Sequence, residues 1–186
     1  MKKNIFIAGV AKSGKSTLAE KICANETYNH IPLDYFASSL KHNFPETKIT
    51  SNVIIEEQSS ANLALLISRV INIINDKDEP FIIDSAHILP KDIIKYIDRN
   101  KWDIYYVGYP NITPIDKFNL LRKYDKPEDW TRKRTDEVLL NTVEQLVELS
   151  KEIKKQCIEN NITFIDTSNN LIEDINKAYE NLGKEQ

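Results

Sequence analysis

The sequence is poor in the residues that staple a chain or break its regular structure: it has only two cysteines and four glycines among 186 residues. Cys23 and Cys157 have neither the number nor the spacing of a disulfide framework or a zinc site, which points to a reducing compartment. No apolar run approaches the roughly 20 residues that cross a bilayer, and none precedes a signal-peptide cleavage site. We therefore expect a cytoplasmic protein that does not span a membrane.

The charges show no excess of one sign. Lys and Arg number 25 against 28 Asp and Glu, which gives a net charge of −3, and the two signs are interspersed. This pattern argues against a nucleic-acid-binding surface and favours a small molecule as the partner. A chain of this length can bury about 70% of its unfolded surface in one domain, so we expect a single domain over residues 1–186, as a monomer or homodimer.

What the chain does contain is the segment Gly9–Ser16, which fits the P-loop pattern G-x-x-x-x-G-K-[ST]. Gly9 and Gly14 let the backbone wrap a phosphate so that successive N–H groups point inward. Lys15 supplies a mobile cation for the β- and γ-phosphates, and the hydroxyl of Ser16 is suited to Mg²⁺. The segment predicts a nucleoside triphosphate site, with ATP and Mg²⁺ as the cofactors.

The flanking residues support this interpretation. The apolar run 4–8 is suited to a buried strand, and residues 16–23 read as an amphipathic helix, so strand, glycine loop and helix occur in the required order. The alternative is a chance glycine turn between a strand and a helix. The residues expected to bind the nucleotide in this region are Gly9, Ala11, Lys12, Ser13, Gly14, Lys15, Ser16 and Thr17.

Apolar runs alternate with helical patterns along the rest of the chain. Further strands are expected at 30–33, 80–83, 104–107 and 162–165, and helices at 61–75, 91–99, 136–159 and 170–182, the last stopped by Gly183. This alternation predicts an α/β fold with a parallel sheet covered on both faces. Ligands in such folds lie beyond the carboxyl ends of the strands. The connections 35–60 and 111–135 are long enough to be more than turns.

Two acidic residues follow predicted strands at this edge. Asp34 is suited to take a proton from an acceptor hydroxyl, or alternatively to cap a helix. Asp84 ends a strongly apolar strand, as a Walker B acid that positions Mg²⁺ does, or alternatively caps a helix or faces solvent. His87, three residues further, is either a ligand contact or a hydrogen-bonded loop residue.

The connection 111–135 carries a dense run of cations. Arginines beside a phosphate site stabilise negative charge on the transferring group, and we expect Arg132 and Arg134 to do so, with Arg122 next. Interspersed acids leave a salt-bridged helix surface as the alternative.

Other polar and aromatic residues bear on the ligands. The loop with Thr167 and Ser168 is placed to border a purine, although Ser168 or Asn169 could instead cap the last helix. A nucleoside or nucleotide is the favoured acceptor, because its base could stack on Tyr35, Phe36 and Phe44. The alternative is that these aromatics are core residues.

Taken together, these residues make the chain resemble the P-loop kinase superfamily, which includes nucleoside monophosphate kinases and shikimate-kinase-like small-molecule kinases. The resemblance implies a five-stranded parallel sheet in the order 2-3-1-4-5, an acceptor-binding insertion at 35–60 and a lid at 111–135. It places Asp34 and Asp84 as the acids after strands 2 and 3, and Thr167–Asn169 in the adenine loop. The segment Arg134–Glu137 is similar to the R-x-D-[DE] ending of adenylate-kinase-like lids.

The departures are informative. The sequence after Asp84 is Ser-Ala-His where ordinary adenylate kinases have Gly-Phe-Pro-Arg, and the lid lacks four cysteines. We therefore expect an ATP- and Mg²⁺-dependent kinase that phosphorylates a small molecule. The alternatives are a nucleotide-dependent regulatory ATPase and a nucleotide-binding module without catalysis.

Overall fold

A computed structural model describes residues 2–182, and its sheet has the strand order β2-β3-β1-β4-β5 with parallel pairing throughout. The strands are β1 (Asn4–Gly9), β2 (Asn29–Pro32), β3 (Phe81–Ser85), β4 (Trp102–Gly108) and β5 (Thr163–Asp166). The expected α/β class and the expected order 2-3-1-4-5 are both confirmed. In this order β1 lies in the middle of the sheet, between β3 and β4, so the segment that follows it emerges at the centre of the carboxyl edge.

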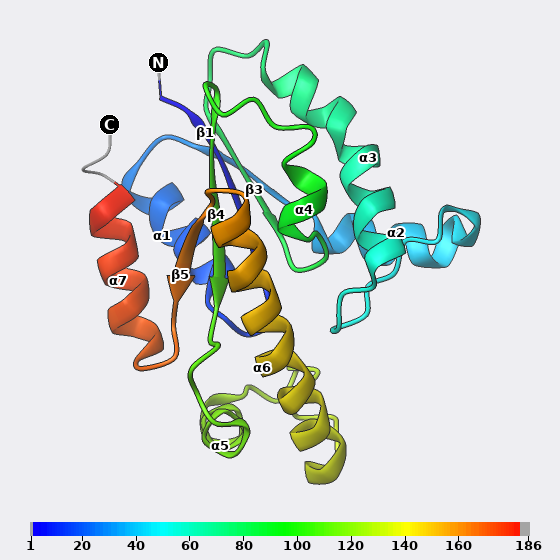
Figure 1. Ribbon diagram of the computed structural model, residues 1–186, viewed down its shortest axis with the longest axis vertical. Coiled ribbons are helices and arrows are strands. Elements are labelled where there is room, and N and C mark those ends of the chain that lie inside the picture. Colours follow the sequence, from blue (N-terminus) through cyan, green and yellow to red (C-terminus); the bar gives the residue numbers. More distant parts are fainter. Residues whose placement is uncertain (1, 183–186) are drawn as a thin grey trace.

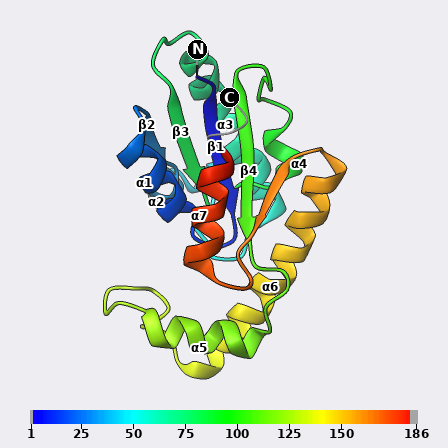
Figure 2. The same cartoon turned by 90° about the vertical axis from the view of Figure 1, so that its left-hand side faces the viewer.

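Helices cover both faces of the sheet. They are α1 (Lys15–Asn25), α2 (Asp34–Asn43), the 3₁₀ helix η1 (Pro45–Thr47), α3 (Glu57–Ile74), α4 (Pro90–Ile93), α5 (Pro114–Tyr124), α6 (Asp136–Glu159) and α7 (Leu171–Leu182). Helices α1 and α7 lie on one face, and α3, α4 and α6 lie on the other (Figure 1). Helix α5 lies beyond the carboxyl ends of the strands (Figure 2).

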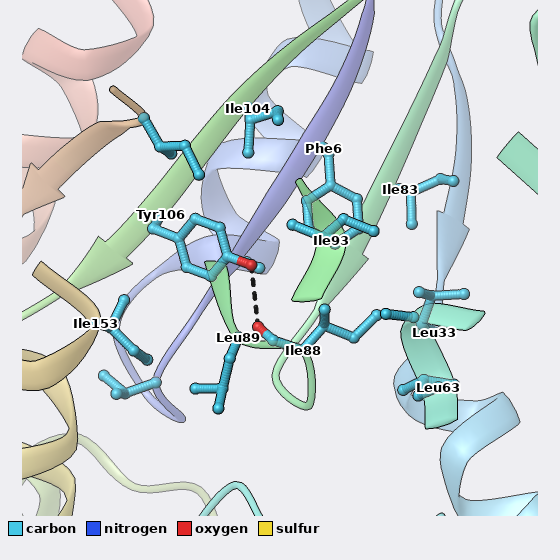
Figure 3. Packing of buried hydrophobic residues seen from close by; sticks show 14 of the residues in the cluster. Phe6, Leu33, Leu63, Ile83, Ile88, Leu89, Ile93, Ile104, Tyr106 and Ile153 are labelled. Atoms are coloured by element: carbon cyan, nitrogen blue, oxygen red, sulfur yellow. Dashed lines mark hydrogen bonds between the residues drawn. The ribbon is translucent and has the colours of Figure 1, made fainter. Parts of the chain in front are cut away.

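Alternate residues of β1 supply the two cores. Ile5 and Ile7 pack with the residues of α1 and α7, whereas Phe6 and Ala8 belong to the larger core under α3, α4 and α6. A parallel strand covered on both faces reads as a continuous apolar run because both sets of side chains are buried. Figure 3 shows the larger core, where the Tyr106 hydroxyl donates to the Ile88 carbonyl at 3.1 Å. This bond satisfies the one polar atom of a fully buried ring.

One predicted helix is wrong in length. The pattern at 91–99 predicted a helix, but α4 spans only Pro90–Ile93. Beyond it the backbone bonds are of the tighter i to i+3 kind, such as that from the Tyr96 N–H to the Ile93 carbonyl. The side chain of Asp98 then accepts from the Asn100 N–H in a turn, an alternative that short polar side chains offer the backbone. The expected stop signal Gly183 lies outside the described residues.

The two long connections contain helices that the sequence patterns missed. Residues 35–60 hold most of α2, all of η1 and the first turn of α3, which begins four residues before its predicted start. Residues 111–135 hold α5, where the hydroxyl of Thr113 accepts from the Asp116 N–H and Pro114 occupies the first turn. A capping threonine followed by proline is a helix-start signal, so α5 was readable from the sequence.

Candidate active site

The loop after β1 has the backbone of an anion cradle. Gly9 has φ of 135°, and a Cβ there would lie 1.9 Å from the carbonyl oxygen of Val107 on the neighbouring strand. Gly14 has φ of 97°, and Lys12 between them is also left-handed, at φ of 58°. When left-handed and ordinary φ values alternate in this way, successive N–H groups point into one concavity. An anion bound there would also lie at the N-terminus of α1.

Two side chains inside the cradle, those of Lys15 and Ser13, are buried by the protein itself. Lys15 is 7% exposed, and its Nζ donates to the Val10 carbonyl at 2.7 Å. Burial lowers the pKa of Lys15, although the nearby carboxylates of Asp34 and Asp84 act in the opposite direction. Within residues 2–182, the Ser13 hydroxyl is among the few buried side-chain atoms with no hydrogen-bond partner. A buried cation and an unsatisfied hydroxyl in one concavity fit a polyanionic ligand.

Asp84 at the end of β3 lies against the start of α1. Its Oδ2 accepts from the Ser16 hydroxyl at 3.3 Å, and its Oδ1 is 3.5 Å from Nε2 of His30. Burial raises the pKa of Asp84, and Asp34 raises it further, while His30, Lys15 and Ser16 lower it. Because Asp84 is 4% exposed and bonds to Ser16, the alternatives of helix capping and solvent exposure are wrong. A hydroxyl and a carboxylate at the cradle are the donor set that Mg²⁺ uses beside substrate phosphates.

Asp34 does not cap its helix. It is the first residue of α2, after the N-cap Leu33, and its Oδ1 accepts from the Ala86 N–H at 3.0 Å. The capping alternative is therefore wrong, and the carboxylate instead ties α2 to the loop after β3. Its side chain is 52% exposed and close enough to the cradle to affect the pKa of Lys15. One edge of the carboxylate is thus held by the protein while the rest stays accessible.

A cavity of about 730 Å³ opens beside the cradle. Its walls bring together seven of the expected nucleotide-binding residues: Lys12, Gly14, Lys15, Ser16, Thr17, Thr167 and Ser168. The remaining three, Gly9, Ala11 and Ser13, belong to the cradle backbone but are not part of the cavity wall. The opposite wall comes from α5 and includes Leu120, Leu121 and Tyr124. A space of this size with apolar walls and a polar floor is typical of a cofactor site.

The loop after β5 is fixed to the cradle. The Thr167 hydroxyl lies 3.1 Å from both the Ser13 and the Gly108 carbonyl oxygens, and Ser168 Oγ accepts from the Asn111 N–H at 3.0 Å. The capping alternative for Ser168 and Asn169 is wrong, because Asn170 accepts from the Glu173 N–H at the start of α7. These bonds join the ends of β4 and β5 to the cradle.

The sequence reasoning missed Lys117. This α5 residue is 6% exposed, its Nζ donates to the Lys12 carbonyl at 2.8 Å, and the same nitrogen lies 3.9 Å from the centroid of the Tyr109 ring. Burial lowers its pKa to about 8, and the positive charges of Lys12 and Lys15 contribute. Lys117 therefore remains mostly protonated at neutral pH and faces the cavity as a second buried cation. The one signal in the sequence was the Thr113–Pro114 helix start, which predicts the helix that carries Lys117.

Lys12 connects the cradle to the segment after α5. Its Nζ lies 2.8 Å from Asp129 Oδ2 and 3.6 Å from Asp125 Oδ1. The Asp125 side chain is 3% exposed, and both acids are part of the cavity wall. The cradle and the segment 125–129 are thus held together by ion pairs around one lysine.

The structure does not bring Arg132 and Arg134 to the cradle. Arg134 stacks on Trp130, with 4.9 Å between its Cζ and the ring centroid, and donates to the Thr142 hydroxyl at 2.7 Å. Arg132 is exposed and makes a 3.4 Å contact with the Arg122 carbonyl. Arg122 pairs with Asp136 at 2.6 Å. These contacts match the salt-bridged alternative, and a catalytic role for Arg132 or Arg134 stays a prediction that requires the segment to move.

None of the helices within residues 2–182 is both long and apolar enough to cross a membrane. In the same part of the chain, no three His, Cys, Asp or Glu side chains gather as a metal centre.

Comparison with solved structures identifies the fold. The chain is similar to a shikimate kinase from Bacteroides thetaiotaomicron at a TM-score of 0.60 and 16% identity, covering 97% of this chain and 98% of that one. It is also similar to a shikimate kinase from Acinetobacter baumannii in complex with shikimate, at 0.58 and 14%, covering 99% and 94%. A gluconokinase from Sinorhizobium meliloti 1021 aligns at 0.54 and 15%, covering 99% and 97%. No protein-family model and no curated protein matches the sequence. The chain therefore has the fold of P-loop small-molecule kinases.

Proposed function

We propose that this protein is an ATP- and Mg²⁺-dependent kinase that transfers the γ-phosphoryl group to a small-molecule acceptor. The observation that carries the proposal is the cradle Gly9–Ser16, with Lys15 buried in it, Asp84 bonded to Ser16 and Asp34 close enough to raise the pKa of Lys15. The shikimate kinases and the gluconokinase with the same fold support it, since all three are named for phosphorylating small molecules.

Each residue of the site has a separate task. The loop amides and Lys15 bind the phosphates, and the amides with Ser13 hold them in a fixed orientation. Ser16 and Asp84 would hold Mg²⁺, which supplies positive charge to the phosphate oxygens when bound. Thr167 and Ser168 border the nucleotide, in the cavity that α5 closes from the other side.

Asp34 is the base in this proposal. Its carboxylate takes the proton of the acceptor hydroxyl while the acceptor oxygen forms a bond to the γ-phosphorus. The bond from that phosphorus to the bridging oxygen breaks, and ADP leaves with the electron pair. The held Oδ1 and the accessible remainder of the carboxylate fit this task, because the base must be fixed and still reach a bound hydroxyl.

More specifically, we propose that the acceptor is a nucleoside or a nucleotide. Tyr35 and Phe36 follow Asp34 directly and are 77% and 54% exposed, and Phe44 is 52% exposed. Exposed aromatic rings on α2 and directly after it are suited to stack on a nucleobase, whereas the alternative that they belong to the core is wrong. Residues 35–60 would form the acceptor-binding insertion and residues 111–135 the lid.

The lid residues would complete the site on closure. Arg132 and Arg134 would reach the transferring phosphoryl group only after Arg134 leaves Trp130 and Thr142. Lys117 already faces the cavity and would add a positive charge beside the phosphates without such a movement.

Product analysis with ATP labelled in the γ-phosphate tests the proposal. The purified protein is incubated with Mg²⁺ and, separately, with nucleosides, nucleotides, sugars and hydroxy acids, and Lys15→Ala serves as the inactive control. Label in an acceptor supports a kinase. Release of phosphate alone would instead identify a regulatory ATPase, and binding without turnover a nucleotide-binding module.

A further inference from the structure

His87 occupies an enclosed position beside the proposed base. It follows β3 by two residues, and its side chain is 10% exposed. The backbone N–H of His87 donates to the Ser85 hydroxyl at 3.1 Å, which fixes the loop at this point. Nε2 of the ring lies 3.6 Å from Oδ1 of Asp34. The tasks assigned to the cradle do not use this ring.

The loop that carries His87 also holds Asp34. Oδ1 of Asp34 accepts from the Ala86 N–H at 3.0 Å, and the same oxygen faces the imidazole. Both contacts lie on one side of the carboxylate. Rotation about the Cβ–Cγ bond of Asp34 would move Oδ1, and the imidazole beside that oxygen restricts this rotation.

We propose that His87 is a positioning residue for Asp34: its imidazole fixes the carboxylate so that the other oxygen is presented to the acceptor hydroxyl. This inference rests on the proposed function. It adds a residue from the loop after β3 to the transfer step and predicts how that step depends on pH.

The charged groups around the ring set its protonation state. The charges of Asp34 from α2 and Lys15 from the cradle act on it, and the ring bonds to the backbone of Asn52. Burial lowers the pKa of His87 below the usual 6.5; Asp34 and the Asn52 bond oppose the shift, and Lys15 adds to it. The ring is therefore neutral at pH 7. At lower pH an imidazolium next to Oδ1 would stabilise the carboxylate and make it a weaker base.

A double-mutant cycle tests the inference. Once an acceptor is found, kcat and KM are measured for His87→Ala, Asp34→Asn and the double variant. His87→Ala should lower kcat by about 10- to 100-fold with KM for ATP unchanged, since a misplaced catalytic group costs that much in rate. In the Asp34→Asn background the same change should have no further effect. Glu79→Ala, at an exposed residue before β3 and outside the segments 35–60 and 111–135, is the control.

The conservative variant His87→Gln guards against a folding defect. Its amide can donate to Oδ1, so kcat at pH 7 should recover much of the loss, and the acid limb of the kcat profile should move to lower pH because the titrating ring is gone. Full kcat in His87→Ala, equal losses in both Asp34 backgrounds, or an acid limb unmoved in His87→Gln would each overturn the inference. A wild-type protein that transfers no phosphate would overturn the proposed function itself, which separates the two failures.

Discussion

The hydroxyl of Ser16 donates to Oδ2 of Asp84 at 3.3 Å, which joins the first turn of α1 to the end of β3. The two residues are 68 positions apart in the sequence, and they meet because β1 and β3 are neighbouring parallel strands. The carboxyl ends of such strands share one edge of the sheet, so residues that follow them converge. The same relationship brings Asp34 to that edge through β2.

Lys15→Ala should lower ATP turnover by about 10²-fold or more, because the variant removes the buried cation from the phosphate cradle. The fold should remain intact, since the Lys15 side chain is held by a bond to the Val10 carbonyl and its charge is disfavoured by burial. Turnover and the melting temperature check both statements, with Lys77→Ala at an exposed position as the control. Wild-type turnover in Lys15→Ala would remove the phosphate assignment.

Asp34→Asn should lower the rate of phosphoryl transfer by about 10²- to 10⁴-fold, the range that a general base contributes. ATP affinity should change little, because the amide keeps the size of the carboxylate and the role proposed for Asp34 concerns the acceptor. Single-turnover transfer and direct ATP titration separate the two quantities. The control is Asp78→Asn, in the exposed loop before β3. Unaltered transfer would assign Asp34 a structural role only.

Asp84→Asn should raise the melting temperature at pH 7 without Mg²⁺ and abolish Mg²⁺-dependent turnover. The sign follows from the raised pKa of Asp84: the charged form is disfavoured in the folded state, so its ionisation costs stability above that pKa, and the cost disappears as the pH falls through it. Thermal unfolding from pH 4 to 8 measures this. Asp103→Asn, at a more exposed residue paired with Lys3, is the control. A lower melting temperature in Asp84→Asn would contradict the prediction.

ATP affinity should weaken between pH 7 and pH 9 as Lys117, whose pKa is about 8, loses its proton. Lys117→Arg should flatten this dependence, since arginine stays charged, and Lys117→Met should bind weakly already at pH 7. Titrations with ATP across this range test it, with Lys123→Arg on the exposed end of α5 as the control. Equal slopes in wild type and Lys117→Arg would show that Lys117 does not face the phosphates.

The depressed pKa of Lys117 also has a consequence for stability. The folded state binds this proton less tightly than the unfolded state, whose lysine has the usual pKa of 10.5. The free energy of unfolding should therefore rise with pH between about 8 and 10.5, and the difference should be absent in Lys117→Met. Denaturant unfolding at pH 7.5 and pH 10 measures it.

Gly9→Ala should destabilise the protein by more than about 3 kcal/mol, because the new methyl group would lie 1.9 Å from the Val107 carbonyl oxygen at a φ that side chains rarely adopt. Denaturant unfolding, or the soluble yield if the loss is larger, checks this. A soluble variant with the wild-type melting temperature would show that β1 and β4 can separate at this point.

The helices and strands were predictable where apolar periodicity was long. The predictions that agree with the structure include the strand 4–8, the helix 136–159 and the order of the elements. They agree because periodicity is a property of the local sequence alone. The 91–99 pattern failed because a turn at Asp98 competes with helix bonds. Helix α5 was not predicted, although Thr113 and Pro114 give a helix-start signal, because the run of cations at 122–134, which overlaps only its last turn, dominated the interpretation of this connection.

The site was predictable only in part, for a related reason. Gly9, Gly14, Lys15 and Ser16 stand at the fixed spacing of the P-loop pattern, so a motif identifies them as candidates. Asp34 and Asp84 are different, because their contacts with Ala86 and Ser16 join segments that are far apart in the sequence. Lys117 looks like any helical lysine until the fold buries it at the cavity.

By itself the sequence determined that β1 is an apolar strand, that the loop after it can adopt left-handed φ values, and that α/β alternation follows. Those properties depend on neighbours within a few residues. Only the tertiary structure decided that His87 stands beside Asp34, that Lys12 holds the acids after α5, and that Arg134 stacks on Trp130. Burial and the distance between charges set these relationships, and both are produced by segments far apart in the chain.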